Sequence, residues 1–205
     1  MEDHHTVTSL EALETLYGQP SKRADLKVND FLDKHSRAFI KVSTFVVLAT
    51  CNREMHTDCS PRGDEAGFVH VLDGKTLLLP DRKGNNRTDS LKNIVVNPSV
   101  SLLFFVPNVY ETFRVNGTAV ISVDPVLLSR CVVQEKAPTT VLTVQEAYIH
   151  CSRALHRSNL WNPEVHTAAK NVPSIGTMLE AHTGGEVRAK SYDAYAKENV
   201  SETLY

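Results

Sequence analysis

The residues best placed to do chemistry lie between Leu77 and Ser90, where an apolar strand passes into a helical pattern. Three cations, an Asn pair and two hydroxyls gather in this stretch: Arg82, Lys83, Asn85, Asn86, Arg87, Thr88 and Ser90. Gly84 and the asparagines tolerate the backbone angles of a tight loop. The start of a helix offers unpaired N–H groups and a dipole that favours an anion. The stretch therefore predicts a phosphate-binding loop. The alternative is a solvated, capped connection, since the spacing matches neither a Walker loop nor a dinucleotide fingerprint.

Composition narrows the class of protein. The chain has 205 residues, 41% of them hydrophobic and 22% charged, which suits one globular domain with a core of good size. A net charge of −2 gives no support for nucleic-acid binding through phosphate neutralisation. No apolar run approaches the length of a membrane span, and the first residues are acidic and polar. We therefore expect a cytoplasmic protein with neither a nucleic-acid nor a membrane partner.

The cysteines and histidines give no metal template. Cys51, Cys59, Cys131 and Cys151 form no Cys-x-x-Cys pair and match no zinc spacing. The nine histidines include no His-Glu-x-x-His arrangement. We expect free thiols in a reducing compartment and assign no metal.

Two flanking segments surround the central pattern. A capping box of Thr8 and Glu11 predicts a helix that ends at Gly18, and weaker helical character continues through Ile40. We interpret residues 1–43 as a helical extension packed on the main domain. Residues 162–205 are expected to be a helical or irregular segment of that same domain, with a loosely ordered tail from Lys190.

Residues 44–161 carry the β pattern. Strands are expected over residues 44–51, 55–60, 68–72, 75–79, 99–106 and 111–123, with residues 141–151 as a strand or a helix. The punctuation of Pro61, Gly63 and Gly67 predicts a polar loop over residues 60–67. A short helix over residues 89–96 should end at Asn97-Pro98, and Asn116-Gly117 should mark a bulge. Hairpin order favours a mainly β fold, a six- to seven-stranded antiparallel barrel with flanking helices, over an alternating parallel sheet.

Three segments together resemble a known family. Residues 85–104, NNRTDSLKNIVVNPSVSLLF, resemble the strand–helix–strand element of the pyridoxamine 5′-phosphate oxidase class of FMN-binding split barrels. The loop DRKGNNRTDSLKNI, the earlier HTDCSPRGD and the later HCSRALHRSNLW follow in the order of one FMN-dependent subfamily. The resemblance runs from about Phe45 to Trp161. It implies a split β-barrel with FMN as its cofactor.

The resemblance also implies which residues hold the cofactor. Loop and helix-start residues would bind the FMN phosphate, namely Arg82, Asn86, Arg87 and Ser90, with Asp81 beside the flavin or the ribityl chain. Ser60 and Arg62 would approach the flavin ring or the phosphate, whereas their spacing alone also fits a surface turn. The oxidases proper carry an Arg-Lys pair where this chain has Asp89-Ser90. Arg87, helped by Arg62 or Arg82, would then meet the phosphate charge.

Family members are homodimers with the flavin between the subunits, so the same partner arrangement is implied here. Arg157 and Trp161 could form a second wall of the site, or could be a solvated cation and a core aromatic. The implied function is an FMN-dependent oxidoreductase acting on an unknown small molecule. The alternatives are a flavin carrier or sensor without turnover, and a split barrel that uses haem or a deazaflavin. We assign no catalytic residue from the sequence.

Overall fold

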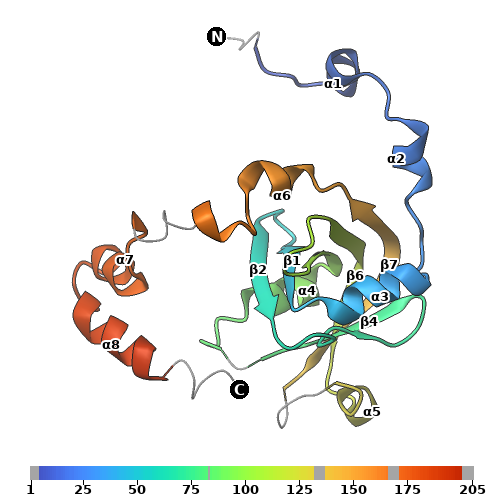
Figure 1. Ribbon diagram of the computed structural model, residues 1–205. Helices are drawn as coiled ribbons and strands as arrows, with labels where there is room; N and C mark the ends of the chain where they lie inside the picture. Colours follow the sequence, from blue (N-terminus) through green and yellow to red (C-terminus); the bar gives the residue numbers. More distant parts are fainter. Residues whose placement is uncertain (1–4, 83, 132–136, 166–170, 200–205) are drawn as a thin grey trace.

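The computed structural model describes residues 5–82, 84–131, 137–165 and 171–199. Its centre is one antiparallel sheet of seven strands in the order β2-β1-β5-β6-β7-β4-β3 (Figure 1). The strands are β1 (Phe45–Cys51), β2 (Thr57–Gly63), β3 (His70–Val71), β4 (Thr76–Pro80), β5 (Ser99–Phe105), β6 (Thr112–Ser122) and β7 (Thr139–His150). The predicted antiparallel split barrel is confirmed. Residues 141–151, for which a helix was the alternative, lie mostly in β7.

Eight helices flank the sheet within the described residues: α1 (Leu10–Tyr17), α2 (Lys22–Leu26), α3 (Lys34–Val42), α4 (Asp89–Val96), α5 (Pro125–Leu128), α6 (Arg153–Ser158), α7 (Ile175–His182) and α8 (Ala189–Asn199). The short helix over residues 89–96 is confirmed as α4. It packs against β1, β2 and β6, so it links the middle of the sheet to one of its edges. No described helix is long and apolar enough to cross a membrane.

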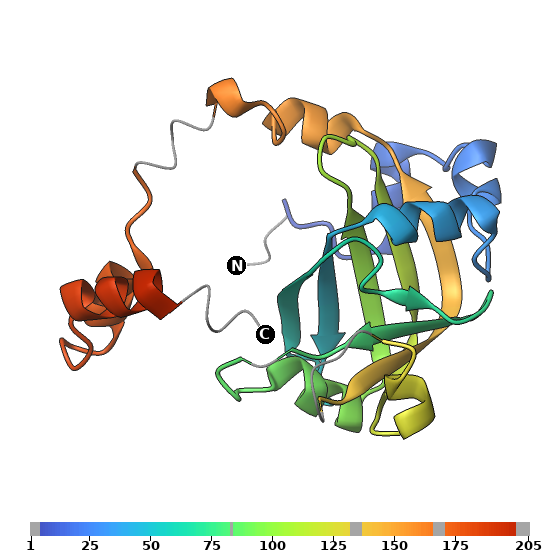
Figure 2. The same cartoon turned by 60° about the horizontal axis from the view of Figure 1, so that its bottom comes forward.

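The core follows from strand alternation. Along β1, Val46 and Leu48 are buried while the residues between them are partly exposed. Along β5, Leu102 and Phe104 show the same period of two, which places all four side chains on the inner face. The sheet coils around these residues (Figure 2). Ile40 of α3 and Ile94 of α4 join the same core.

The bulge expected at Asn116-Gly117 is confirmed by a register shift between β6 and β7 at this point. The bulge needs glycine, because a Cβ on Gly117 would lie 2.0 Å from the carbonyl oxygen of Thr143. The close approach lets the two longest strands bend together around the barrel.

Two local predictions are wrong. Ser60–Gly63 continue β2 and do not form a loop. Pro61 is tolerated there because β2 is the last strand at its end of the sheet, where a missing N–H removes no essential ladder bond. The first helix is capped by Ser9, whose side chain accepts from the Ala12 N–H, and Thr8 lies outside it.

The tail from Lys190 is more ordered than predicted over its described part, since α8 runs to Asn199; residues 200–205 lie outside the described residues. The Ser174 hydroxyl and the Gly176 N–H both donate to Asp193, and the Ala189 N–H donates to Glu180. These contacts pair α7 with α8. The pair stands apart from the barrel in Figures 1 and 2. Helices α1 and α2, at the other end of the chain, contribute no buried residue.

Candidate functional site

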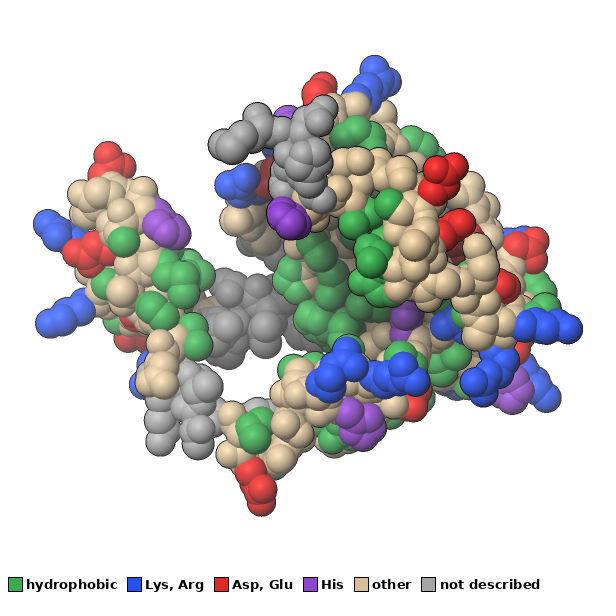
Figure 3. All heavy atoms as spheres, turned by 90° about the horizontal axis from the view of Figure 1, so that it is seen from above, with side chains coloured by type: hydrophobic (Ala, Val, Ile, Leu, Met, Phe, Trp, Pro, Cys, Tyr) green, Lys and Arg blue, Asp and Glu red, His purple; other side chains and the backbone are tan. Residues whose placement is uncertain are grey.

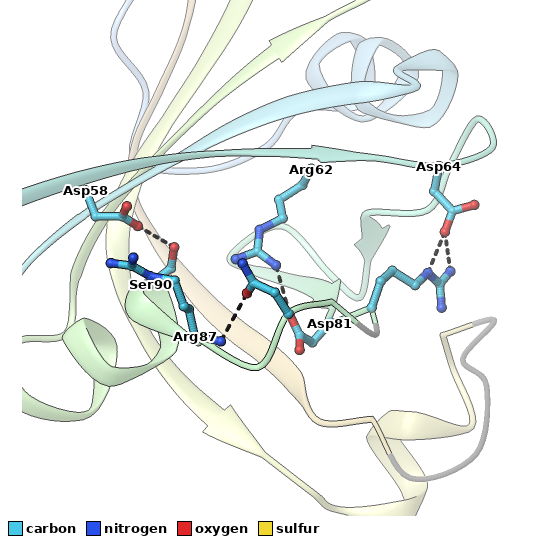
Figure 4. A network of polar contacts seen from close by, with 8 residues as sticks. Asp58, Arg62, Asp64, Asp81, Arg87 and Ser90 are labelled. Atoms are coloured by element: carbon cyan, nitrogen blue, oxygen red, sulfur yellow. Dashed lines mark hydrogen bonds and ion pairs between the residues drawn. The ribbon is translucent and has the colours of Figure 1, made fainter. Parts of the chain in front are cut away.

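A cavity of about 550 Å³ opens where β2, the loop after β4 and the first turn of α4 meet. Asp58, Ser60 and Arg62 reach it from β2, because alternate residues of a strand share one face. Seven of the nine residues implied to bind the cofactor line this cavity: Ser60, Arg62, Asp81, Arg82, Asn86, Arg87 and Ser90. Segments about 20 residues apart in the sequence are thus brought into one site (Figure 4).

Arg62 is a largely enclosed cation that pairs with a carboxylate of the cavity lining. Its Nη1 donates to Asp81 Oδ1 at 2.8 Å, and the side chains of Arg62 and Asp81 are only 23% and 20% exposed. Its Nε is buried and has no hydrogen-bond partner within the described part of the chain. A buried guanidinium N–H without an acceptor is costly unless a ligand or water supplies one. Arg62 therefore has donor capacity left for an anion.

The other two arginines are held differently. Arg82 Nε donates to Asp64 Oδ2 at 2.6 Å, and the Asp64 side chain is 6% exposed. This ion pair fastens the loop after β4 to the end of β2. Arg87 Nε pairs with Asp89 Oδ2 at 2.8 Å, but the Arg87 side chain is 76% exposed. Arg87 therefore stands at the solvent side of the cavity, and an exposed pair of this kind contributes little stability.

Among the described residues, cations and carboxylates are equal in number in the cavity lining. Three arginines and three aspartates line it, the aspartates being Asp58, Asp81 and Asp89. Attraction of an anion would therefore depend on the direction of individual N–H groups more than on net charge. A planar guanidinium suits this role, because it can serve a carboxylate with one edge and a phosphate with another.

Asp58 is a site residue that sequence reasoning missed. The buried Ser90 hydroxyl donates to Asp58 Oδ2 at 2.5 Å, which ties the first turn of α4 to β2. Thr50 stands behind them at 3.5 Å from the same oxygen, and it accepts from Asn93 Nδ2 at 3.0 Å. The available signal was the period of two through Asp58, Ser60 and Arg62. Because the predicted strand ended at Ser60, Arg62 was placed in a loop and the shared face of these three residues was not recognised.

The loop backbone is unusual at two non-glycine residues. Asn86 has φ of 60° and Thr88 has φ of 54°, both in the left-handed region. Asn adopts this region readily, whereas a β-branched residue there is a true outlier. Thr88 also gives α4 no side-chain cap. The first-turn N–H groups of α4 have no acceptor inside the helix. They lie beside the cavity, and the Thr88 side chain does not cap them.

These features fit the phosphate end of FMN. The cavity offers the Arg62 Nε, the outer edge of Arg87 and the first turn of α4 as donors to one anion. Asp89-Ser90, which replace the basic pair of the oxidases proper, serve other contacts, because Asp89 pairs with Arg87 and Ser90 with Asp58. The side chain of Arg62 is the more enclosed of the two arginines named for the phosphate charge, at 23% exposed against 76% for Arg87.

Arg157 and Trp161 do not line this cavity. Arg157 is exposed on α6, and Trp161 Nε1 donates to the carbonyl oxygen of Val109 at 2.8 Å, between β5 and β6. A role for them at a partner's site remains a prediction. No histidine occurs among the described residues that line the cavity. Across the described residues, no group of three or more His, Cys, Asp or Glu side chains is arranged to hold a metal ion.

The coiled antiparallel sheet and the loop–helix pocket at its edge define a split-barrel protein. The chain belongs to the pyridoxamine 5′-phosphate oxidase family, whose family model matches residues 32–151, more than half of the chain. The match spans β1 to β7 and contains every residue that lines the cavity. None of the curated proteins matches this chain.

Solved structures with a similar fold are distant in sequence. A putative pyridoxamine 5′-phosphate oxidase from Lactobacillus delbrueckii is 22% identical, covers 58% of this chain and 95% of its own, and gives a TM-score of 0.46. An F420 reductase is 20% identical, with coverages of 56% and 94% and a TM-score of 0.39. A heme-binding protein from Mycobacterium smegmatis is 15% identical, with coverages of 58% and 57% and a TM-score of 0.42. The ligands in these names belong to those proteins.

Proposed function

We propose that this chain is an FMN-binding flavoprotein that holds the cofactor phosphate in the cavity between β2 and α4 and acts as an oxidoreductase on a small molecule. The observation that carries the proposal is Arg62, which lines the same cavity as the start of α4 and whose buried Nε has no hydrogen-bond partner among the described residues. Membership of the pyridoxamine 5′-phosphate oxidase family supports it.

Each residue of the site would have a distinct part in binding. Arg62 would donate to the phosphate while Asp81 holds its other edge, so the guanidinium is already oriented before the ligand arrives. Asp58 and Ser90 would fix the first turn of α4 against β2 and so aim its N–H groups at the same anion. Arg87 and Asn86 would close the solvent side. Arg82 would act through the loop, because its ion pair with Asp64 sets the position of Asp81 next to it.

Bound FMN would supply the electron-transfer chemistry, while the protein orients it and sets the electrostatics around it. The described lining residues include arginines, aspartates and hydroxyls, and Asp58, Asp81 and Asp89 are each occupied by a hydrogen bond or an ion pair to another lining residue. The proposal therefore names the cofactor and the class of reaction, with the substrate to be found by assay.

The first experiment is spectroscopic. The purified protein, as isolated or after incubation with FMN and desalting, should be yellow and carry close to one flavin per chain. A colourless protein that retains no FMN after reconstitution would overturn the proposal. Haem would be recognised in the same spectrum by its Soret band, and a deazaflavin by its own absorbance and fluorescence.

The second experiment separates turnover from carriage. NADH or NADPH is added under anaerobic conditions to the FMN-loaded protein, and the flavin absorbance is followed. Bleaching that reverses on admission of air supports an oxidoreductase. A protein that binds FMN but is bleached by neither donor would support the flavin carrier or sensor, the second candidate function.

We also propose that the functional unit is a homodimer. The outer face of β1 and β5 is apolar: Phe45 is 40% exposed and packs edge-on against Phe105, with ring centroids 5.9 Å apart. Figure 3 shows hydrophobic side chains gathered in the hollow between the barrel and the α7–α8 pair. A second copy covering this face would remove apolar surface from water, the main favourable term in association.

Sedimentation analysis tests the dimer. Phe45→Glu should shift the protein towards monomer, whereas Val126→Glu, at a valine of α5 that is 65% exposed, should leave the assembly unchanged. A wild-type protein that sediments as a monomer at all concentrations would refute this part of the proposal. Equal weakening by both substitutions would show that the interface lies elsewhere.

A further inference from the structure

A second polar cluster lies on the opposite face of the sheet from the core, at the C-terminal end of β7, whereas Pro138 of the cavity precedes the start of that strand. Arg114 of β6 faces Tyr148 of β7 in register, and Thr112 faces His150. The neighbours of these residues along each strand, Phe113, Val115 and Ala147, are buried in the core, so Arg114 and Tyr148 must point outwards. Lys27 joins them from the segment after α2. Lys27, Arg114, Tyr148 and His150 are called the β6–β7 cluster below.

The β6–β7 cluster concentrates positive charge around one aromatic ring. The Lys27 Nζ lies 5.2 Å and the Arg114 Cζ 5.7 Å from the centre of the Tyr148 ring. Arg114 Nη1 donates to the Tyr148 hydroxyl at 3.1 Å, and Lys27 donates to the carbonyl oxygen of Ile149 at 3.0 Å. Lys27 and Arg114 thus both contact the Tyr148 ring. Each cation is attracted to the ring, but the two positive charges repel one another.

No carboxylate of the described residues forms an ion pair with either cation. Glu146, two residues before Tyr148 on β7, accepts from Asn116 Nδ2 at 2.9 Å. Asn116 in turn accepts from the Ser101 hydroxyl at 2.7 Å, so this acidic side chain belongs to a neighbouring polar network. The positive charge of Lys27 and Arg114 is therefore not neutralised by a direct contact. This differs from the cavity, where each arginine contacts an aspartate.

His150 completes the β6–β7 cluster. Its ring centre lies 5.1 Å from that of Tyr148, and its Nε2 is buried with no hydrogen-bond partner within the described residues. Burial, and then the nearby charges of Arg114 and Lys27, lower the pKa of His150 below its ordinary range. A buried imidazole nitrogen without a partner, next to two cations, is a cost that packing does not explain.

We propose that the β6–β7 cluster is a binding site for the anionic group of a small molecule, a carboxylate or a phosphate, separate from the cavity between β2 and α4. An anion there would accept from the free edge of the Arg114 guanidinium and from His150, and would offset the charge of Lys27. The site lies outside the proposed flavin pocket, since none of its residues lines that cavity. It goes beyond the proposed function, because FMN phosphate is assigned to the cavity.

A bound anion must also change the titration of His150. Its negative charge favours the imidazolium form, so binding raises the pKa of His150 towards or above its ordinary value. By linkage, the anion binds more tightly as the pH falls through that pKa. Arg114 acts as the bidentate donor, so Arg114→Lys should weaken binding and Arg114→Gln should abolish it.

Histidine NMR of the protein in the presence of excess FMN tests this site directly. The His150 resonance is assigned by its loss in His150→Gln, and its pKa is followed while inorganic phosphate, or in a second arm acetate, replaces chloride at constant ionic strength. We expect a saturable rise of about one pKa unit or less with one of the two anions, corresponding to a tenfold or smaller affinity ratio between the two protonation states of His150. The arm that saturates at lower concentration identifies the anion as a phosphate or a carboxylate.

The variants decide between a site and a general ionic effect. The response should disappear in Arg114→Gln and persist in the control Arg130→Gln, which changes an exposed arginine outside the β6–β7 cluster. The His150 response should also persist in Arg62→Gln, because Arg62 belongs to the cavity and not to the β6–β7 cluster. Failure of the FMN proposal would therefore leave this response in place. The proposal is overturned if neither anion produces a saturable shift of His150, or if Arg114→Gln shows the same shift as the wild type.

Discussion

Arg62→Gln is the substitution that bears most directly on the flavin site. The Arg62 guanidinium pairs with Asp81 at 2.8 Å, and its buried Nε has no partner among the residues that the structure describes, so it is held ready to donate to an anion. A hydrogen bond to a charged group contributes about 1.5–3 kcal/mol. Its loss should therefore weaken FMN binding by about 10- to 150-fold.

Arg87→Gln is the matched control for Arg62→Gln. Both residues line the cavity and both pair with an aspartate, but the Arg87 side chain is 76% exposed and that of Arg62 is 23% exposed. Exposed charge pairs contribute about 0.2–1 kcal/mol, so Arg87→Gln should weaken FMN binding by only about 1.5- to 5-fold. Arg62→Lys should fall between the two, because it keeps the charge and loses the fork of donors.

Quenching of FMN fluorescence at one fixed salt concentration measures the three affinities. A thermal melt of each variant without FMN shows whether the fold has been retained, because Arg62→Gln also leaves the Asp81 carboxylate without its partner. The reasoning is refuted if Arg62→Gln binds FMN within twofold of the wild type. An equal or larger loss in Arg87→Gln would equally show that the phosphate is met at the solvent side.

Three further predictions concern the fold around these sites. Thr88→Asn should increase the free energy of unfolding by about 1 kcal/mol or more, because Asn suits the left-handed φ of 54° that strains threonine. The melting temperature should rise accordingly. A lower melting temperature would mean that the Thr88 side chain makes a stabilising contact. Gly117→Ala should lower the free energy of unfolding by several kcal/mol, because the added Cβ would lie 2.0 Å from the Thr143 carbonyl oxygen and overpack the bulge. A loss below about 1 kcal/mol in a denaturant titration would contradict this. His150→Gln should make unfolding less sensitive to acid. The pKa of His150 is lowered in the folded state, so the neutral imidazole costs no stability above the unfolded pKa of about 6.5. The wild type loses free energy of unfolding as the pH falls from there through the folded pKa. Parallel plots of unfolding free energy against pH for the wild type and His150→Gln would rule this out.

Much of the fold was accessible from local patterns. The apolar alternation of β1 and β5, the stop at Asn97-Pro98 and the bulge at Gly117 each depend on residues close together in the sequence. The predictions failed where tertiary position overrides local preference. Pro61 resembles loop punctuation, and only its place on the last strand of the sheet makes it compatible with β2.

Seven of the nine residues named from the sequence meet in one cavity, but the contacts among them could not be predicted. Residue types and family resemblance indicated seven residues that the structure brings to one cavity. The ion pairs of Arg62 with Asp81 and Arg82 with Asp64 join residues 19 and 18 positions apart, and local periodicity says nothing about contacts of that range. The same holds for the bond from Ser90 to Asp58, 32 positions away, which shows that Ser90 positions α4.

The pairs also change the electrostatic picture. The sequence indicated a loop rich in cations, whereas the described lining of the cavity also contains aspartates from β2, the loop and α4, two of which pair with its arginines. Binding would then depend on preorganised donors, which lose little entropy when the ligand arrives. This is the physical reason to expect a strong preference for a phosphate with the right geometry over anions in general.

The most direct test of the central claim compares FMN with riboflavin, which differs from it only by the phosphate. Isothermal titration of the flavin-free protein with each compound gives the contribution of that group. If the cavity between β2 and α4 holds the phosphate, FMN should bind at least about 100-fold more tightly than riboflavin, equivalent to about 2.7 kcal/mol, and Arg62→Gln should remove most of that difference. Equal affinities for the two flavins, or binding of neither, would contradict the account.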